Sequence, residues 1–134
     1  MTPSIAPSVL RIDEDGAPTL LGGRSATSGL RHFPLAPVCP YTGATDVEPL
    51  DLPREGRVWL WTEVTAAPPG YGGPLPYGLG IVELAGEPLL RVVARLGAAP
   101  DGGWQEGTPV RLVAEELPDV DGEPALTWCF EATS

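Results

Sequence analysis

The chain has 134 residues, which is enough for one compact domain or two very small ones. Its net charge is −10, and all 8 basic residues are arginines. Nucleic-acid binding depends largely on basic side chains that neutralise phosphates, so this charge argues against a nucleic-acid-binding protein unless the arginines gather on one face. The 17 glycines and 17 prolines lie between apolar runs, which indicates many short strands separated by turns.

The sequence carries no sign of export or membrane insertion. Residues 1–15 contain no basic segment followed by an apolar one, so no secretory signal is expected. No stretch approaches the ~18 apolar residues that a membrane-spanning helix needs. Cys39 and Cys129 lie far apart and do not make a disulfide framework. We therefore expect a soluble, cytoplasmic protein.

The chain divides into a front part and a strand-rich part. Residues 1–18 are polar and interrupted by prolines, and we expect an N-terminal arm, extended or forming a short helix. Residues 19–46 carry a motif described below, and residues 47–55 are expected to be a connector. From residue 56, runs of β-branched and aromatic residues between turn signals predict strands, and we assign 56–134 to one domain. The predicted strands span residues 57–65, 77–84, 88–96, 109–116 and 124–131.

The last three predicted strands alternate apolar and mostly polar residues, which is typical of strands with one buried face. The residues expected to point inward are Leu90, Val92, Ala94, Leu96, Val110, Leu112, Ala114, Leu126, Trp128 and Phe130. Five short strands with a long loop after the first predict a mainly β fold, compatible with a small Greek-key barrel such as the OB-fold. Periodicity alone does not separate this barrel from another small barrel or a sandwich.

Two short pairs in the front part have the spacing of a structural zinc site. The first pair is Ser25 and Ser28, and Gly29 follows it. The second pair is Cys39 and Thr42, and Gly43 follows it. With cysteine at all four positions, this would be the double knuckle of a tetrahedral zinc site. Neutral hydroxyls are poor zinc ligands, and His32 adds only one further ligand. Chance spacing in a Ser/Gly-rich loop is the alternative interpretation.

The segment resembles the N-terminal rubredoxin-like zinc ribbon of the acyl-CoA-associated OB-fold family known as domain of unknown function 35. That ribbon reads G-x-C-x2-C-G-x3-F-P-x4-C-P-x-C-G. Downstream, the resemblance continues through a G-x-V strand start, a P-P-G-Y loop, P-Y, a V-E-L strand and a G-T-P-V strand start, and it covers roughly residues 20–116. The matching ribbon residues are Gly23, Gly29, Phe33, Pro34, Cys39, Pro40 and Gly43.

The resemblance implies a five-stranded OB-fold barrel preceded by a small ribbon that has lost its zinc. Its vestigial ligand positions are Ser25, Ser28, Cys39 and Thr42, so we expect no bound zinc and no other cofactor. The three hydroxyls are expected to bond to the turn backbone in place of a metal. Without zinc, packing or a partner must hold the ribbon, and the packing candidates are Phe33, Leu35, Val38 and Tyr41.

The resemblance also implies a function. Family members assemble with thiolase-fold, hydratase or aldolase subunits, and the chemistry belongs to the partner. The sequence agrees, because it contains no G-x-S-x-G, no Gly-rich phosphate loop and no paired-carboxylate motif, and no basic residue near Cys129 in sequence lowers its pKa. We expect a non-catalytic accessory subunit in a hetero-oligomer with an acyl-CoA enzyme, with a CoA ester shared between the subunits. A stand-alone acyl-CoA binding module and a single-stranded nucleic-acid-binding OB-fold are the alternatives.

Seven residues are candidate contacts to the partner or to acyl-CoA, and each group has a structural alternative. Trp59 and Trp61 are expected on one strand face, opposite Val58, Leu60 and Thr62. They also suit a core over Gly78 and Gly80. Arg91 and Arg95 suit CoA phosphates, with Arg111 as a neighbour. They also suit ion pairs with Glu83 or Glu115. The Pro68–Pro76 loop is either a binding rim or a plain connector. The candidates are Trp59, Trp61, Pro69, Tyr71, Tyr77, Arg91 and Arg95.

Overall fold

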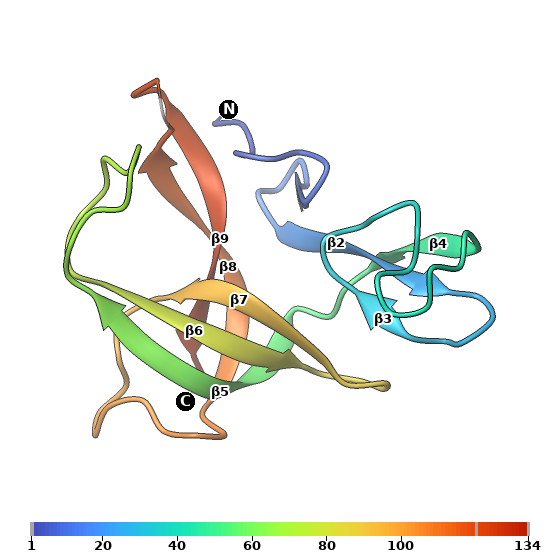
Figure 1. Ribbon diagram of the computed structural model, residues 1–134. Coiled ribbons are helices and arrows are strands. Elements are labelled where there is room, and N and C mark those ends of the chain that lie inside the picture. Colours follow the sequence, from blue (N-terminus) through green and yellow to red (C-terminus); the bar gives the residue numbers. More distant parts are fainter. Residues whose placement is uncertain (1, 120, 134) are drawn as a thin grey trace.

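The computed structural model describes residues 2–119 and 121–133, and in these residues it contains nine strands and no helix. The described part of the chain therefore has no helix that spans a membrane. Figure 1 shows a small N-terminal sheet beside a barrel. The N-terminal strands are β1 (Leu10–Ile12), β2 (Pro18–Ser25), β3 (Arg31–His32) and β4 (Val47–Asp51). The later strands are β5 (Glu55–Val64), β6 (Tyr77–Leu84), β7 (Leu90–Leu96), β8 (Pro109–Pro118) and β9 (Pro124–Ala132).

The last five strands form a closed barrel in the order β5-β6-β7-β9-β8, which confirms the predicted OB-fold. All neighbours are antiparallel except β7 and β9, which are parallel and pair only through Arg95 with Cys129 and Leu96 with Phe130. The β8–β9 hairpin extends past this short contact and projects from the barrel (Figure 1). The contact between β7 and β9 is therefore the narrowest seam of the barrel.

The barrel interior is apolar, as predicted, but three residues differ from the expectation. All four predicted inward residues of β7 are buried, and so are Val110, Leu112 and Phe130. Ala114, Leu126 and Trp128 are only partly buried. They lie on the β8–β9 hairpin near or beyond its short pairing with β7, and on β9 the opposite face carries the buried Ala125 and Cys129.

The two strand tryptophans do not share a face, which corrects the prediction. The register between β5 and β6 shifts by one residue, since Val58 pairs with Val82 but Leu60 pairs with Ile81. The extra residue is Trp59, and such a bulge inverts the alternation of all later residues. Leu60 therefore shares the outer face with Ile81, while Trp61 is paired with Gly80 on the inward face.

The N-terminal sheet is larger than the predicted ribbon. In this sheet β2 pairs with β1, β3 and β4. The expected arm thus contains β1, and the expected connector contains β4. Pro49 lies inside β4, where a strand prediction from sequence is weakest because proline cannot donate a ladder hydrogen bond.

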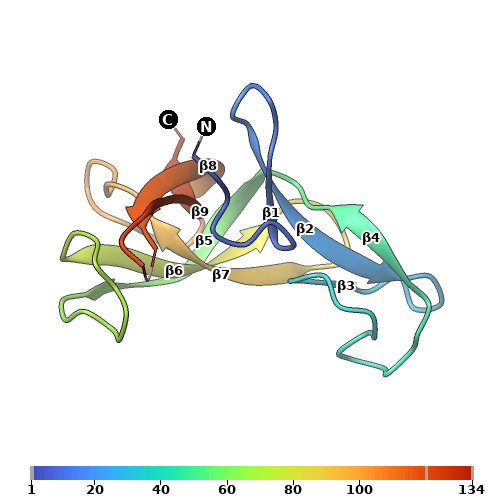
Figure 2. The same cartoon turned by 90° about the horizontal axis from the view of Figure 1, so that it is seen from above.

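The N-terminal sheet and the barrel share one core. Leu10, Leu20 and Leu52 are buried in the same cluster as the barrel residues Val82 and Phe130. Figure 2 shows the sheet lying beside the barrel. The front part therefore does not fold as a separate unit around its own centre.

Two further contacts close the region near the seam. The indole nitrogen of Trp128 donates to the Val93 carbonyl at 3.3 Å, and the ring packs edge-on against Phe33 at 5.8 Å. The backbone near the N-terminus adds to the free edge of β9, because the Ile5 amide donates to the Leu126 carbonyl at 2.8 Å. Phe33 therefore packs as expected, whereas the other three ribbon packing candidates are exposed, namely Leu35, Val38 and Tyr41.

Candidate functional site

The outer face of β5, β6 and β7 holds most of the predicted contact residues. Arg91 lies with its guanidinium carbon 3.6 Å from the centre of the Trp59 ring. The same guanidinium is 3.1 Å from the Glu83 carboxylate. Arg91 is thus held by an aromatic ring and by one of the two glutamates that the structural alternative named.

Arg95 lies one step along β7 and is also neutralised inside the chain. Its Nε donates to Glu115 at 2.6 Å, and its guanidinium lies 4.2 Å from the centre of the Tyr77 ring. Burial lowers the pKa of Arg95, but the hydrogen bond and charge of Glu115 outweigh it and raise the pKa overall. Both arginines therefore make the carboxylate pairs that were the alternative to phosphate binding.

The loop after β5 forms the rim of a cleft, as one of the two interpretations expected. Tyr71 and Tyr77 lie 5.0 Å apart between ring centres, and the Tyr71 hydroxyl donates to the Pro74 carbonyl at 2.7 Å. Together with Pro69 and Arg95 they line a cleft of about 310 Å³ whose walls are mostly apolar. The loop is therefore more than a connector in shape, since it places two aromatic rings over an arginine.

Trp61 lies apart from this cleft. It faces the end of the barrel near Trp104, and the two rings line a hollow of about 570 Å³ with Gly78. The side chain is still 43% exposed, so it is neither core nor part of the Trp59–Arg91 stack.

An apolar row that the sequence analysis did not select crosses the outer face of the barrel. Leu60, Ile81 and Val93 pair in register across β5, β6 and β7. Leu60 is 50% exposed and Val93 is 58% exposed. With Leu79 they line an apolar groove of about 430 Å³. Val93 is an apolar residue on the otherwise polar face of β7, which is a signal in the sequence. The outward position of Leu60 on β5 could not be predicted, because it depends on the bulge at Trp59.

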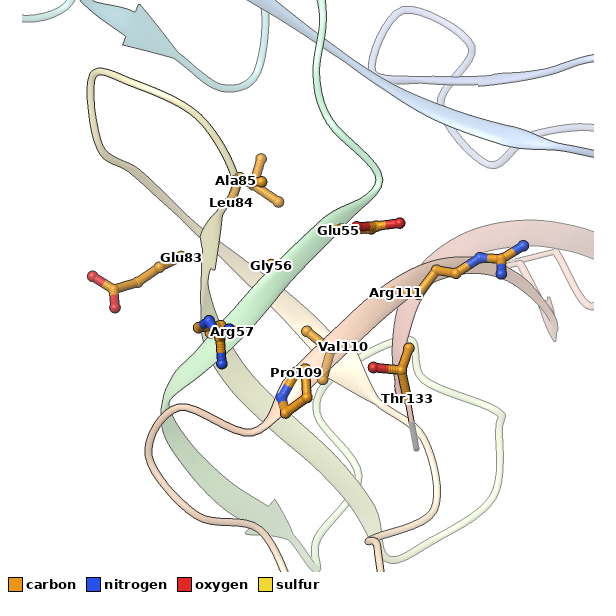
Figure 3. Close-up of a pocket in the computed structure, with 10 residues that line it drawn as sticks. All are labelled: Glu55, Gly56, Arg57, Glu83, Leu84, Ala85, Pro109, Val110, Arg111 and Thr133. Atoms are coloured by element: carbon orange, nitrogen blue, oxygen red, sulfur yellow. The ribbon is translucent and has the colours of Figure 1, made fainter.

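A second hollow, of about 470 Å³, lies where β5 meets β8 (Figure 3). Arg57 and Arg111 both line it, but so do Glu55 and Glu83. Figure 3 shows the Glu83 and Arg111 side chains pointing in opposite directions. Arg111 is therefore not a neighbour of Arg91 and Arg95 as expected, and the mixed charges do not define an anion site.

The turn that follows Ser25 is organised by a carboxylate. The Ser25 hydroxyl donates to Asp46 at 2.9 Å, and the Thr27 amide donates to the same carboxylate at 2.7 Å. The Thr27 hydroxyl is a further donor. These bonds, first from Thr27 and then from Ser25, hold the pKa of Asp46 below its usual value. Sequence reasoning missed Asp46 because it lies outside the C-x2-C spacing.

The predicted hydroxyl-to-backbone bonds are present at all three positions. Ser25 Oγ accepts from the Ser28 amide at 3.3 Å, and Ser28 Oγ accepts from the Leu30 amide at 3.2 Å. Thr42 Oγ1 accepts from the Ala44 amide at 3.3 Å. The hydroxyls thus bond to the backbone of their own turns.

Both turns end on a glycine in the left-handed region. The φ angles are 75° at Gly29 and 77° at Gly43, a conformation that other residues rarely adopt. Cys39 is fully buried in the second turn, and its carbonyl accepts from Gly43 at 2.9 Å. A hydrogen bond with Thr42 lowers the pKa of the Cys39 thiol, although burial opposes this shift. Among the described residues, no three His, Cys, Asp or Glu side chains cluster to hold a metal ion.

The remaining reactive side chains are buried. Burial raises the pKa of the Cys129 thiol to about 12. His32 is 1% exposed, and its Nε2 accepts a hydrogen bond from the Ala36 amide at 3.2 Å. Neither group is placed to meet a substrate from solvent.

The barrel, with its short parallel seam, defines the class of the chain as an OB-fold protein. Residues 50–115 match the family model described as "ChsH2, C-terminal OB-fold domain". These residues are therefore similar to the OB-fold domain that this family model describes.

Relatives extend the similarity over the N-terminal sheet. A "DUF35 domain-containing scaffold protein" of Pyrococcus furiosus is 29% identical over 84% of this chain and 80% of its own length. "Benzoylsuccinyl-CoA thiolase subunit BbsA" of Thauera aromatica is 29% identical over 92% of this chain and 84% of its own length. The solved structure "Ltp2-ChsH2(DUF35) aldolase" contains a chain with a TM-score of 0.63 and 27% identity, covering 85% of this chain and 84% of that one.

Proposed function

We propose that this chain is a non-catalytic accessory subunit of a thiolase-fold acyl-CoA enzyme. The observation that carries the proposal is the similarity to the named thiolase subunit, which extends over 92% of the chain and so includes both the N-terminal sheet and the barrel. The aldolase structure and the scaffold protein support the same role, because both names describe proteins that work in assemblies.

The positions of the reactive groups support a non-catalytic role. Both thiols are buried, and burial raises the pKa of Cys129 to about 12. The histidine lies on β3 and is buried. A nucleophile or general base must reach its substrate within hydrogen-bonding distance. The partner subunit would therefore supply the catalytic residues, and this chain would stabilise the assembly and help to shape the acyl-CoA channel.

The test is reconstitution with a thiolase-fold subunit, for which the genes neighbouring this chain's gene are the first place to search. We expect the two proteins to co-purify and the thiolase or aldolase reaction to require both. Calorimetry with acetyl-CoA separates the alternatives: tight binding to the isolated chain favours a stand-alone module, whereas binding only after the partner is added favours the subunit. Micromolar binding of single-stranded DNA at physiological salt would favour the nucleic-acid alternative and contradict the proposal.

The ribbon part of the proposal is that these turns are zinc knuckles that work without zinc. The left-handed glycines after each pair support it, because a knuckle turn needs them. The Asp46 contacts support it as well, because they tie the first turn to the start of β4. Elemental analysis of the purified chain should find far less than one zinc per chain. A triple variant restores the four thiols by adding Ser25→Cys, Ser28→Cys and Thr42→Cys to Cys39. This variant should bind one zinc ion per chain. Stoichiometric zinc in the natural chain would refute the proposal.

A further inference from the structure

The outer face of β5, β6 and β7 is more apolar than a barrel wall requires. We call Leu60, Leu79, Ile81 and Val93 the β5–β7 patch. The barrel interior beneath it is already filled by the buried residues of the same strands, so the fold does not need a second apolar face. Two patch residues are at least half exposed. Contiguous apolar surface of this kind is typical of a protein–protein contact.

Among the described residues, no segment covers the patch, since Leu60 and Val93 are at least half exposed. A second copy is disfavoured by charge, because each chain carries −10 and association would bring two acidic molecules together. Charge therefore favours a different molecule as the cover.

The charges around the patch indicate what that molecule is. Arg91 borders the patch on one side and is paired with Glu83, and Arg95 borders the other side and is paired with Glu115. Both arginines are thus neutralised before any ligand arrives, and phosphate groups find no unpaired cation at this edge. An electrically neutral rim around an apolar centre matches a protein surface that is apolar and poor in charge.

We propose that the β5–β7 patch is the surface on which the thiolase-fold enzyme subunit docks. This inference rests on the proposed function and adds the face and the chemistry of the contact. The enzyme subunit contributes an apolar surface, and Trp59, held beneath Arg91, borders the contact as a rigid wall. Because the rim charges are paired within the chain, the affinity depends little on salt.

A matched pair of leucines tests the surface. Leu60 is 50% exposed within the patch, and Leu89 is 54% exposed in the turn before β7, outside it. Binding to the separately purified thiolase-fold subunit is measured by calorimetry for the natural chain, Leu60→Arg, Val93→Arg and Leu89→Arg. We expect the two patch variants to lose at least about tenfold in affinity, as for truncation of an interface hot spot, and Leu89→Arg to bind as the natural chain does.

The controls keep the outcomes separate. Both patch side chains point outward, so the variants should retain the far-UV circular dichroism of the natural chain. The natural affinity should change less than about threefold between about 0.1 and 0.5 M salt, where exposed ion pairs are strongly screened. Unchanged binding by Leu60→Arg and Val93→Arg, or equal loss in Leu89→Arg, overturns the docking surface alone. Failure of the natural chain to bind the enzyme subunit overturns the proposed function as well, and a homodimer that Leu60→Arg dissociates assigns the patch to a second copy.

Discussion

Replacing Arg31 with alanine tests how the N-terminal sheet is held to the barrel. Arg31 lies on β3 and is only 5% exposed. Its guanidinium donates to the Pro88 carbonyl at 2.6 and 2.8 Å, to Ala85 at 3.1 Å and to Gly86 at 3.2 Å. All of these acceptors belong to the turn between β6 and β7. One buried cation from the sheet therefore fixes one turn of the barrel.

The magnitude follows from these bonds. A hydrogen bond with a charged donor contributes about 1.5–3 kcal/mol. The Ala85 and Gly86 carbonyls lie in an exposed turn and can bond to water once the guanidinium is gone, so roughly two effective bonds are lost. The cost of burying the cation offsets part of the stabilisation that these bonds provide, and burial also lowers the pKa of Arg31. We expect Arg31→Ala to lower the free energy of unfolding by about 3 kcal/mol.

Urea unfolding and calorimetry measure this loss. A change of about 3 kcal/mol corresponds to a fall of roughly 10 °C in the Tm of a chain of this size. Arg24 pairs with Arg31 across the two strands and is exposed, so Arg24→Ala is the matched control and should change stability by less than about 0.5 kcal/mol. Arg31→Lys should give an intermediate loss, because an ammonium group cannot reach all the acceptors at once. Equal stabilities for the Arg31→Ala and Arg24→Ala variants would refute the anchoring role.

Three further predictions concern packing, acid and thiols. In Gly23→Ala the added Cβ would lie 2.6 Å from the His32 ring, so we expect a loss of about 2 kcal/mol by urea unfolding, against less than about 0.5 kcal/mol for Gly72→Ala, where the nearest atom is 3.5 Å away. The pKa of Asp46 is lower in the folded state, so its stabilisation is complete above the unfolded value near 3.8 and is lost as the pH falls through the folded value. Asp46→Asn should therefore flatten the dependence of Tm on pH below about 4, and an unchanged acid profile would argue against the carboxylate. Cys129 should resist thiol-specific labelling at about pH 8 until the chain unfolds, and rapid labelling of the native protein would contradict its burial.

Much of the barrel could be predicted from local patterns. The alternation in β7 places its buried residues correctly because a strand with one buried face has a period of two. Turn residues between the apolar runs mark the strand ends well. Two turns of the N-terminal sheet could also be anticipated, because Gly29 and Gly43 follow the paired positions and both adopt the left-handed conformation.

The candidate site was harder to predict because it depends on register. One extra residue at Trp59 moves Leu60 to the outer face, and nothing in the local sequence marks that bulge. Whether Arg91 and Arg95 are free or paired depends on which carboxylates the neighbouring strands bring close. Glu83 lies on the adjacent β6, but Glu115 comes from β8, which does not pair with β7. Residue types and spacing therefore select the right strands, but only the strand pairing decides which side chains remain available.

Packing against the barrel also explains how the short strands of the N-terminal sheet are held. β1 and β3 contain three and two residues, and strands this short are not stable in isolation. A zinc ion solves that problem in a small ribbon by cross-linking its turns. Here Leu10 and Leu20 are buried in the barrel core, and Arg31 bonds to a barrel turn. Because the barrel holds the sheet from outside, the two turns that end at Gly29 and Gly43 need only their own hydrogen bonds.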